Sequence, residues 1–235
     1  MKGKLIVIDG IDGSGKATQA ALLAKRLKKE GYAVKTIDFP RYKDNFFGKL
    51  IGECLTGTYG DFVGLHARIA SCLYAGDRFE SSKQIRTWIE KGYVVITDRY
   101  VSSNQIHQGG KIENLKERKV FLSWLDQMEY KVFGIPKPDL VIYLDVPFEV
   151  SAMWLKNKTA QNKKSYLKGG KDTAEESMKY LQDSRDSALL LARQNKNWTR
   201  IACCKGMVCM PPEPVGEEVY KRALKLFGKY AKTKD

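Results

Sequence analysis

The segment between residues 5 and 18 constrains the fold of this 235-residue chain more than any other. A short apolar run, Leu5–Ile8, leads into a glycine-rich sequence of the form GxxxxGK, and an amphipathic stretch follows. Strand, glycine-rich turn and helix in this order are typical of a loop whose backbone amides surround phosphate, with a lysine adding a full positive charge. We therefore predict a nucleotide phosphate site here. Its residues are Gly10, Ile11, Asp12, Gly13, Ser14, Gly15, Lys16, Ala17 and Thr18.

One position of this loop departs from the usual pattern. Where a serine or threonine hydroxyl commonly ligates Mg²⁺, the chain has Ala17, and Thr18 lies one residue further round the helix. Because Thr18 cannot simply take over that role, we expect water to complete the metal shell. The loop indicates nucleotide binding, but it does not say what is done with the phosphate.

Apolar and amphipathic segments alternate along the chain in the manner of an α/β fold. The first helix should run from Gly15 to Glu30, with Gly31 as its stop. Short apolar runs predict strands buried on both faces, hence a parallel sheet covered by helices, in a single domain over residues 1–235. The predicted strands are Leu5–Ile8, Ala33–Phe39, Val94–Thr97, Leu140–Leu144 and Trp198–Cys203.

Further helices are expected around 62–91, 113–133, 173–196 and 216–230. Residues 156–172 are different, being polar, basic and glycine-containing without a clear period. A loop of that length inside a compact domain is usually functional or disordered, so we predict a mobile lid there. The alternative is a solvated run of charge.

Composition narrows the class of protein. At 43% hydrophobic, and without an apolar run near the ~20 residues of a membrane span, the chain is expected to have no membrane partner and to be cytoplasmic. The net charge of +14 favours polyanions, but a nucleotide enzyme also needs positive charge, so we do not expect a nucleic-acid partner. An odd number of cysteines without metal spacing predicts free thiols. They are Cys54, Cys72, Cys203, Cys204 and Cys209.

Several further segments occur in an order that resembles the thymidylate kinase family over nearly the whole chain. Phe39-Pro40-Arg41-Tyr42 and Asp98-Arg99-Tyr100 are the most diagnostic. The resemblance implies a three-layer P-loop NTPase fold with a five-stranded parallel sheet, a homodimer, and transfer of the γ-phosphoryl of ATP to dTMP with Mg²⁺. The other matching segments are Asp9–Thr18, Tyr74–Glu80, Ser103-Asn104-Gln105 and Asp172-Thr173-Ala174-Glu175 at the end of the lid.

The resemblance implies that residues of about 39–110 bind the acceptor. Arg99 and Arg41 would hold the dTMP phosphate with Tyr42 beside them, since two guanidiniums suit a dianion. Asp12 would accept a hydrogen bond from the sugar 3′-hydroxyl. His107 lies where many members place a tyrosine near the 2′ side of the sugar.

For the base, the resemblance implies that Tyr74 stacks on thymine and that Arg78 and Asn104 bond to it, while Phe39 and Ser103 complete the dTMP site. Tyr74 and Arg78 lie four residues apart and so share one helix face. On spacing alone, a core aromatic and a salt bridge are the alternative explanations for this pair.

Lys16 and Arg99 are the predicted catalytic cations, and Asp9 and Asp98 are the predicted metal-side carboxylates, acting partly through water. The alternatives are a loop-organising role for Asp9 and a structural cap for Asp98.

Some family members have an arginine where this chain has Gly13, so we expect the lid to supply positive charge, with Lys158 and Lys171 as the catalytic candidates. Trp154 replaces a basic residue common at the start of the lid. The lid lysines are Lys156, Lys158, Lys163, Lys164, Lys168 and Lys171.

Two other functions remain open at this point. One is a kinase of the same fold for a different monophosphate or deoxynucleoside, against which Tyr74, Arg78 and the phosphate-holding arginines argue. The other is a nucleotide-binding protein without transfer activity, which the departures at Ala17 and Trp154 keep open.

Overall fold

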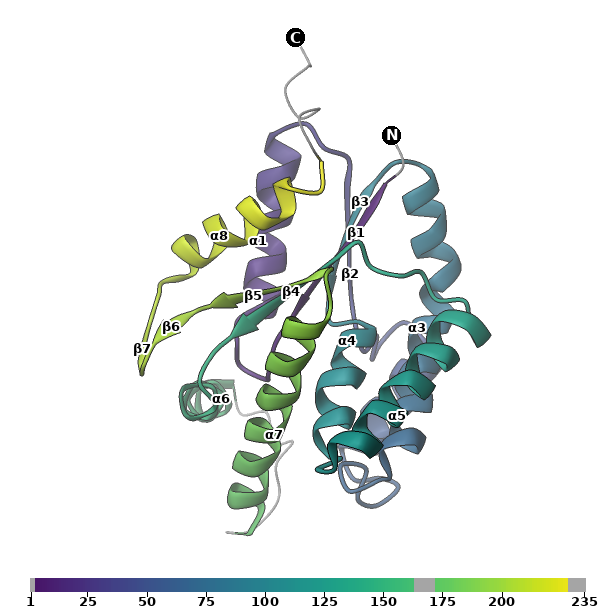
Figure 1. Ribbon diagram of the computed structural model, residues 1–235, viewed down its shortest axis with the longest axis vertical. Coiled ribbons are helices and arrows are strands. Elements are labelled where there is room, and N and C mark those ends of the chain that lie inside the picture. The colour runs from purple at the N-terminus through teal and green to yellow at the C-terminus, as the bar shows by residue number, and fades with distance from the viewer. Residues whose placement is uncertain (1–2, 163–171, 228–235) are drawn as a thin grey trace.

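The computed structural model describes residues 3–162 and 172–227, with side chains described up to residue 156 in the first part and from residue 178 in the second. Figure 1 shows a twisted central sheet with helices on both of its faces. The predicted α/β class with a five-stranded parallel sheet is confirmed.

The five strands pair in the order β2-β3-β1-β4-β5, and all four pairings are parallel. The central strand β1 therefore has β3 on one side and β4 on the other. The connection after β1 runs to β2 on one side of the sheet, whereas the connection after β4 runs to β5 on the other. In open α/β sheets, ligands bind in the crevice at such a switch point, outside the carboxyl ends of the strands. The strands are β1 (Lys4–Asp9), β2 (Val34–Asp38), β3 (Val94–Asp98), β4 (Leu140–Asp145) and β5 (Trp198–Ala202).

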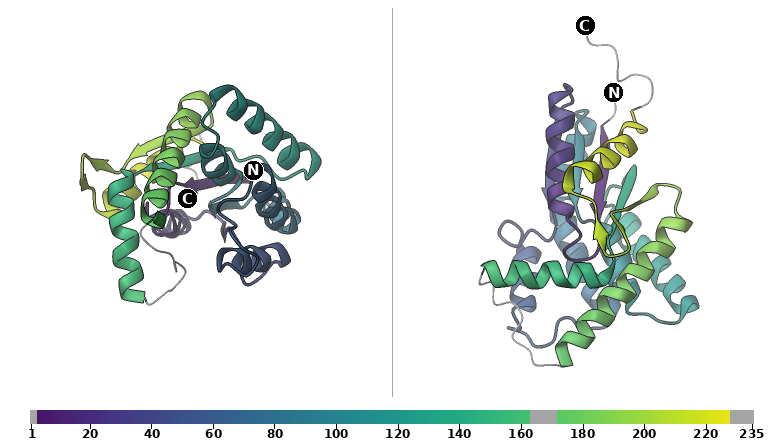
Figure 2. Two further views of the ribbon diagram at one scale, coloured as in Figure 1. Left: turned by 90° about the horizontal axis from the view of Figure 1, so that it is seen from below. Right: turned by 90° about the vertical axis from the view of Figure 1, so that its left-hand side faces the viewer.

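Alternate side chains of the buried strands enter two different cores. Ile6 and Ile8 pack with apolar residues of α1 (Lys16–Lys29) and α8 (Pro212–Leu224). Leu5 and Val7 point the other way. They pack with residues of α3 (Ala67–Glu90), α4 (Val101–Ser103), the π-helical segment η1 (Asn104–Gln108) and α7 (Asp172–Gln194). The two further views in Figure 2 separate these layers.

The remaining elements lie around this frame. They are α2 (Phe46–Leu55), α5 (Leu115–Asp126), the π-helical segment η2 (Gln127–Val132), α6 (Phe148–Asn162), and the two-stranded hairpin of β6 (Cys204–Lys205) and β7 (Val208–Cys209). Within the described residues, no helix combines the length and apolar character of a membrane span.

Two element predictions need correction. No helix was predicted between residues 133 and 173, yet α6 runs from Phe148 to Asn162, so the first part of the segment expected to be a loop is helical. The last helix begins at Pro212 rather than near residue 216, because proline fits the first turn of a helix, where its missing amide hydrogen is not needed.

The prediction of five free thiols was also wrong in part. Cys204 and Cys209 form a disulfide, whereas Cys54, Cys72 and Cys203 are free. An odd number of cysteines argues against complete pairing but allows one bond. The two partners lie directly opposite each other in the short antiparallel ladder of β6 and β7, a placement that only the tertiary structure reveals.

Candidate active site at the carboxyl ends of β1 and β3

The glycine-rich loop joins β1 to α1 at the switch point of the sheet. Gly13 and Gly15 have φ angles of 83° and 86°, in the left-handed region that glycine enters without strain. A Cβ at Gly10 would lie 2.3 Å from Ser14 Oγ and 2.9 Å from the Leu144 carbonyl oxygen, so the loop passes β4 too closely for a side chain. Local backbone requirements therefore account for the glycines of this loop.

Lys16 occupies the first position of α1 and is buried, with 7% of its surface exposed. Its ammonium group donates a hydrogen bond to the Ile11 carbonyl at 2.9 Å and lies 3.9 Å from Asp12 Oδ1. Burial and the nearby charge of Arg99 lower the pKa of Lys16 to about 8. Burial disfavours the charged form of the ammonium group. Anionic phosphate oxygens bound beside it would favour that charged form again, so the position suits a phosphate ligand. Ala17 and Thr18 lie exposed on the same helix.

Arg99 follows β3 directly and is the one residue other than glycine with positive φ, 64°, in the described part of the chain. Such a backbone costs about 1–3 kcal/mol and persists only where the surroundings hold it. Here the Arg99 amide donates to the Ile8 carbonyl at 3.0 Å. The guanidinium forms an ion pair with Asp12, and its Nη1 lies 3.1 Å from His107 Nε2. Arg99 holds the pKa of the Asp12 carboxyl well below its usual range.

Asp9 is fully buried at the end of β1, and its carboxylate accepts hydrogen bonds from three directions. The donors are the Ser102 hydroxyl at 2.5 Å, the Ser103 hydroxyl at 2.9 and 3.0 Å, and the Gly10 amide at 2.8 Å. Asp9 thus ties the glycine-rich loop to the start of α4. Ser103, predicted to contact dTMP, bonds to Asp9 in this structure.

Asp98, at the end of β3, differs from Asp9. Its Oδ1 is buried without a hydrogen-bond partner among the described residues. Burial raises the pKa of this carboxyl, against the opposing charges of Lys16 and Arg99. A buried carboxylate oxygen that lacks a donor and lies within the electrostatic influence of Lys16 is a candidate for water or a hydrated cation.

The loop that carries Phe39 and Arg41 contains a cis peptide bond between Phe39 and Pro40. Asp77 of α3 anchors this loop, since its carboxylate accepts hydrogen bonds from the Arg41 amide at 3.0 Å and from the Asn45 side chain at 2.8 Å. The Arg41 guanidinium is bound to Asp44 at 2.9 Å. Sequence reasoning did not single out Asp77, although it lies inside the Tyr74–Glu80 segment.

Arg78 is buried and makes a two-pronged ion pair with Glu129 of η2, at 2.7 and 2.6 Å. Asn104 donates to the same carboxylate at 3.0 Å and to the Ser71 carbonyl at 3.2 Å. Glu129 has 0% exposure, so it is the buried counter-charge of this side of the site. Nothing in the sequence pattern pointed to Glu129, because its partner lies 51 residues away.

Aromatic side chains lie next to these polar networks. Tyr74 of α3 is partly buried, with its ring 5.7 Å from that of Phe62. Burial holds the pKa of the Tyr74 hydroxyl above its usual range, and the charges of Arg99 and Asp12 are close enough to influence it. Tyr42 is 47% exposed, whereas Phe39 is buried with its ring 5.8 Å from Tyr100.

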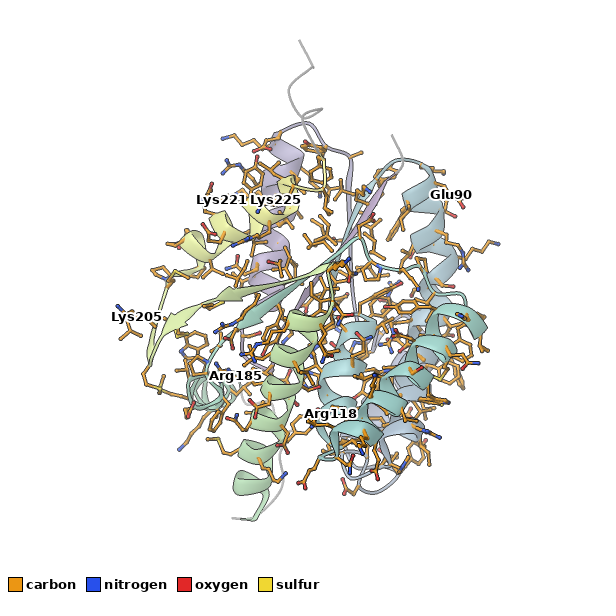
Figure 3. All side chains as sticks on the ribbon, viewed as in Figure 1. Glu90, Arg118, Arg185, Lys205, Lys221 and Lys225 are labelled. Carbon is orange, nitrogen blue, oxygen red and sulfur yellow. A yellow bond between two sulfur atoms is a disulfide. The ribbon has the colours of Figure 1, made fainter. Side chains whose placement is uncertain are left out.

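Helix α7 contributes residues that sequence reasoning missed. Tyr180 stacks on the His107 ring, with 5.6 Å between the centroids and 15° between the planes, and Ser184 Oγ lies 3.1 Å from His107 Nδ1. The next residue, Arg185 (labelled in Figure 3), donates to the buried Asp145 carboxylate at 2.7 Å, and Arg200 of β5 donates to the same carboxylate. A period of 3.6 predicted the helix, but not which of its faces meets the site.

The predicted lid lies largely outside what the structure describes. Lys171 falls in the undescribed segment, and Lys158 belongs to α6 but its side chain is not among those described. Within the described residues, no group of three or more histidine, cysteine, aspartate or glutamate side chains is arranged to hold a metal ion.

Comparisons with known proteins show the family of this chain. The family model described as Thymidylate kinase matches residues 8–206. A probable thymidylate kinase of Pyrococcus abyssi is 39% identical over 153 residues, covering 64% of this chain and 69% of its own. A thymidylate kinase of Mycobacterium tuberculosis is 34% identical over 148 residues, covering 63% and 68%. The solved thymidylate kinase of Candida albicans superposes with a TM-score of 0.70 at 25% identity, covering 96% and 93%. The chain belongs to the thymidylate kinase family.

Proposed function

We propose that the protein transfers the γ-phosphoryl group of ATP to dTMP, forming ADP and dTDP. The observation that carries this proposal is the meeting of Lys16 and Arg99 at Asp12, where the ammonium lies 3.9 Å from Asp12 Oδ1 and the guanidinium pairs with the same oxygen. One cation belongs to the donor loop and the other to the segment assigned to the acceptor. Phosphoryl transfer chiefly requires two anions to be aligned and their charge stabilised.

On the donor side, the backbone amides after Gly10 and the ammonium of Lys16 would hold the β- and γ-phosphates. On the acceptor side, Arg99 would bind the dTMP phosphate, joined by Arg41 when its guanidinium exchanges Asp44 for the substrate. A new P–O bond then forms to an acceptor oxygen as the bond to ADP breaks. Bidentate guanidinium contacts hold the acceptor in line.

The base would stack on Tyr74, a partly buried ring close enough to Arg99 and Asp12 to be influenced by their charges. Arg78 and Asn104 both bond to Glu129, and this shared carboxylate fixes their orientation. The Arg78 guanidinium keeps hydrogens that can be donated to a carbonyl oxygen of a pyrimidine such as thymine. Both amide hydrogens of Asn104 are taken by Glu129 and Ser71, so its Oδ1 would accept from the ring N–H of the base. Activity on dUMP should be weaker but detectable, since one methyl group contributes only ~1 kcal/mol in an apolar pocket.

The residues present fit a Mg²⁺ ion that is held mainly by ATP and water. Asp98 Oδ1 is buried and has no hydrogen-bond partner in the described part of the chain, so it can accept from metal-bound water, whereas Asp9 already has three donors. Mg²⁺ usually keeps several waters beside one or two carboxylates and substrate phosphates, which matches a site without the hydroxyl at Ala17. When bound, the ion would neutralise charge on the β- and γ-phosphates. Asp9 is better placed to orient Ser102 and Ser103.

The homodimer and the catalytic lid remain parts of the proposal. Large apolar side chains are exposed on α3, α5 and η2, and a second copy packed on these helices would cover them. They are Ile69, Phe79, Leu115, Val120 and Val132. Light scattering at working concentration tests the dimer, and a monomeric mass would reject it. Lys158→Ala and Lys171→Ala, assayed separately for kcat, test which lid lysine contributes charge.

The function itself is tested by a coupled assay of ADP release with ATP and Mg²⁺, offering dTMP beside dUMP, dCMP, dGMP and AMP. We expect turnover that strongly favours dTMP and is lost in Lys16→Ala and Arg99→Ala. Preference for another monophosphate would identify a different acceptor. ATP binding without any acceptor-dependent turnover would identify a nucleotide-binding protein instead.

A further inference from the structure

Both ring nitrogens of His107 are engaged, which is unusual for a residue whose expected role is a sugar contact. The side chain is 7% exposed, on the π-helical segment η1. Its Nδ1 lies 3.1 Å from Ser184 Oγ on α7, and its Nε2 lies 3.1 Å from Nη1 of Arg99. Tyr180 stacks against the ring at 5.6 Å. π-Helical turns of this kind often lie at functional sites.

The partners determine where the imidazole proton lies. A guanidinium has only donors, so Nε2 must accept from Arg99 and therefore carries no proton. The single proton of the neutral ring is then on Nδ1, which donates it to Ser184 Oγ.

The charged groups that face this ring are Arg99, Asp12, Asp9 and Lys16. Burial and the charge of Arg99 lower the pKa of His107 to about 4, against the opposing effect of the carboxylates. The ring is consequently neutral at physiological pH.

The neutral acceptor His107 holds the Arg99 guanidinium without reducing its positive charge, which Asp12 cannot do. Asp12 binds the guanidinium strongly but cancels part of its positive charge. His107 accepts a hydrogen bond from the opposite side of the fork without adding negative charge. The two contacts together fix the plane of the guanidinium while leaving its charge available to an anion.

We propose that His107 is a positioning residue, which holds the Arg99 guanidinium in the orientation needed for the acceptor phosphate, and that Ser184 sets the tautomer required for this. The inference rests on the proposed function of Arg99 as the dTMP phosphate ligand. It replaces the sugar contact implied by the sequence resemblance with a contact to the arginine.

The test uses variants that separate the two ring nitrogens. His107→Phe keeps a ring against Tyr180 but has no acceptor, and His107→Gln places an amide oxygen near the position of Nε2. Ser184→Ala removes the tautomer partner, which is also a hydrogen-bond partner of Tyr180. We expect His107→Phe to raise the KM for dTMP about tenfold, the effect of one hydrogen bond to a charged group, with the KM for ATP unchanged. His107→Gln should recover most of the wild-type KM, and Ser184→Ala should be intermediate. His66→Phe, at an exposed helix cap, is the matched control.

The contact is identified by comparing dTMP with thymidine, which lacks the phosphate, by titration calorimetry. If His107 acts through Arg99, His107→Phe weakens binding of dTMP and leaves thymidine binding as in the wild type. Equal weakening of both ligands would mean a contact with the nucleoside or a general structural role, and would overturn the inference. Unchanged binding of both would overturn it as well.

Nitrogen NMR of the imidazole gives a readout that needs no substrate. The chain has two histidines, so His107→Phe assigns the signals. We expect His107 to be neutral with its proton on Nδ1 at pH 7; an Nε2-protonated or charged ring would reject the inference. Failure of the proposed function is distinguishable, because it would appear as wild-type protein that does not turn over dTMP.

Discussion

The donor and acceptor sides of this site are built in different ways. The donor side is one continuous loop from Gly10 to Thr18, and its shape follows from glycines with φ near 85° and from the start of α1. The acceptor side combines residues from the β2–α2 loop, α3, β3, η1, η2 and α7. Its key contacts join residues such as Arg78 and Glu129, which are 51 positions apart.

Because of this difference, we expect the donor and acceptor sides to respond differently to mutation. A loop whose shape is set locally keeps its conformation as long as its own φ and ψ angles remain allowed. An assembled site depends on buried pairs, and removing one member leaves the other without a partner. Changes to acceptor residues should therefore affect both folding and binding, whereas changes to donor residues should affect chemistry with little loss of stability.

The largest effect should come from breaking the buried pair. Glu129→Gln removes the carboxylate that neutralises Arg78, both at most 3% exposed, so the free energy of unfolding should fall by about 3–5 kcal/mol. Urea denaturation measures this. Glu113→Gln, in the exposed pair with Lys179, is the control and should leave the unfolding midpoint unchanged. If both variants were equally stable, the acceptor side would not depend on this pair.

On the donor side, Lys16→Ala should reduce kcat by about 10²–10³-fold, as expected for losing one preorganised charge at the transferred group. The unfolding midpoint should not fall, because burying the ammonium costs stability in the free protein. Lys25→Ala, an exposed lysine of the same helix, should be unchanged in both measurements. A large loss of stability in Lys16→Ala would remove the contrast between the two sides.

Arg99→Lys keeps the charge but loses the planar fork. We expect kcat/KM for dTMP to fall up to about 100-fold, since small misplacements of a reacting group have effects of that size. Steady-state kinetics with varied dTMP measures it, with the KM for ATP as an internal reference. Arg41→Lys should have a smaller effect, because the Arg41 guanidinium is already bound to the exposed Asp44. Equal effects of the two substitutions would show that Arg99 and Arg41 contribute equally to binding the dTMP phosphate.

The smallest expected effect is a pH dependence of the donor side. The pKa of Lys16 is lowered to about 8 in the free protein, and bound phosphates should raise it, so ATP binding above that pH requires proton uptake. ATP affinity should be constant below pH 8 and weaken above it by at most about tenfold per pH unit. Calorimetric titration up to about pH 9.5 measures this. Lys16→Arg should remove the pH dependence of ATP affinity. If the dependence persisted in this variant, a group other than Lys16 would cause it.

Much of the fold was accessible from patterns along the chain. The central strands, helix α1 and the parallel sheet were predicted because strands buried on both faces are short, continuous apolar runs. Helices α2 and α6 were both missed. In both cases a short or polar segment gives a weak periodic signal.

Among the site residues, the sequence by itself determined the phosphate loop and the identity of the predicted side chains, because spacing and glycine requirements are local. Only the tertiary structure decided what those side chains touch: Ser103 bonds to Asp9, Arg78 pairs with Glu129, and Arg99 lies between Asp12 and His107. The physical reason is that a buried charge takes the partner that the packed elements bring to it. Sequence separation carries no information about that partner.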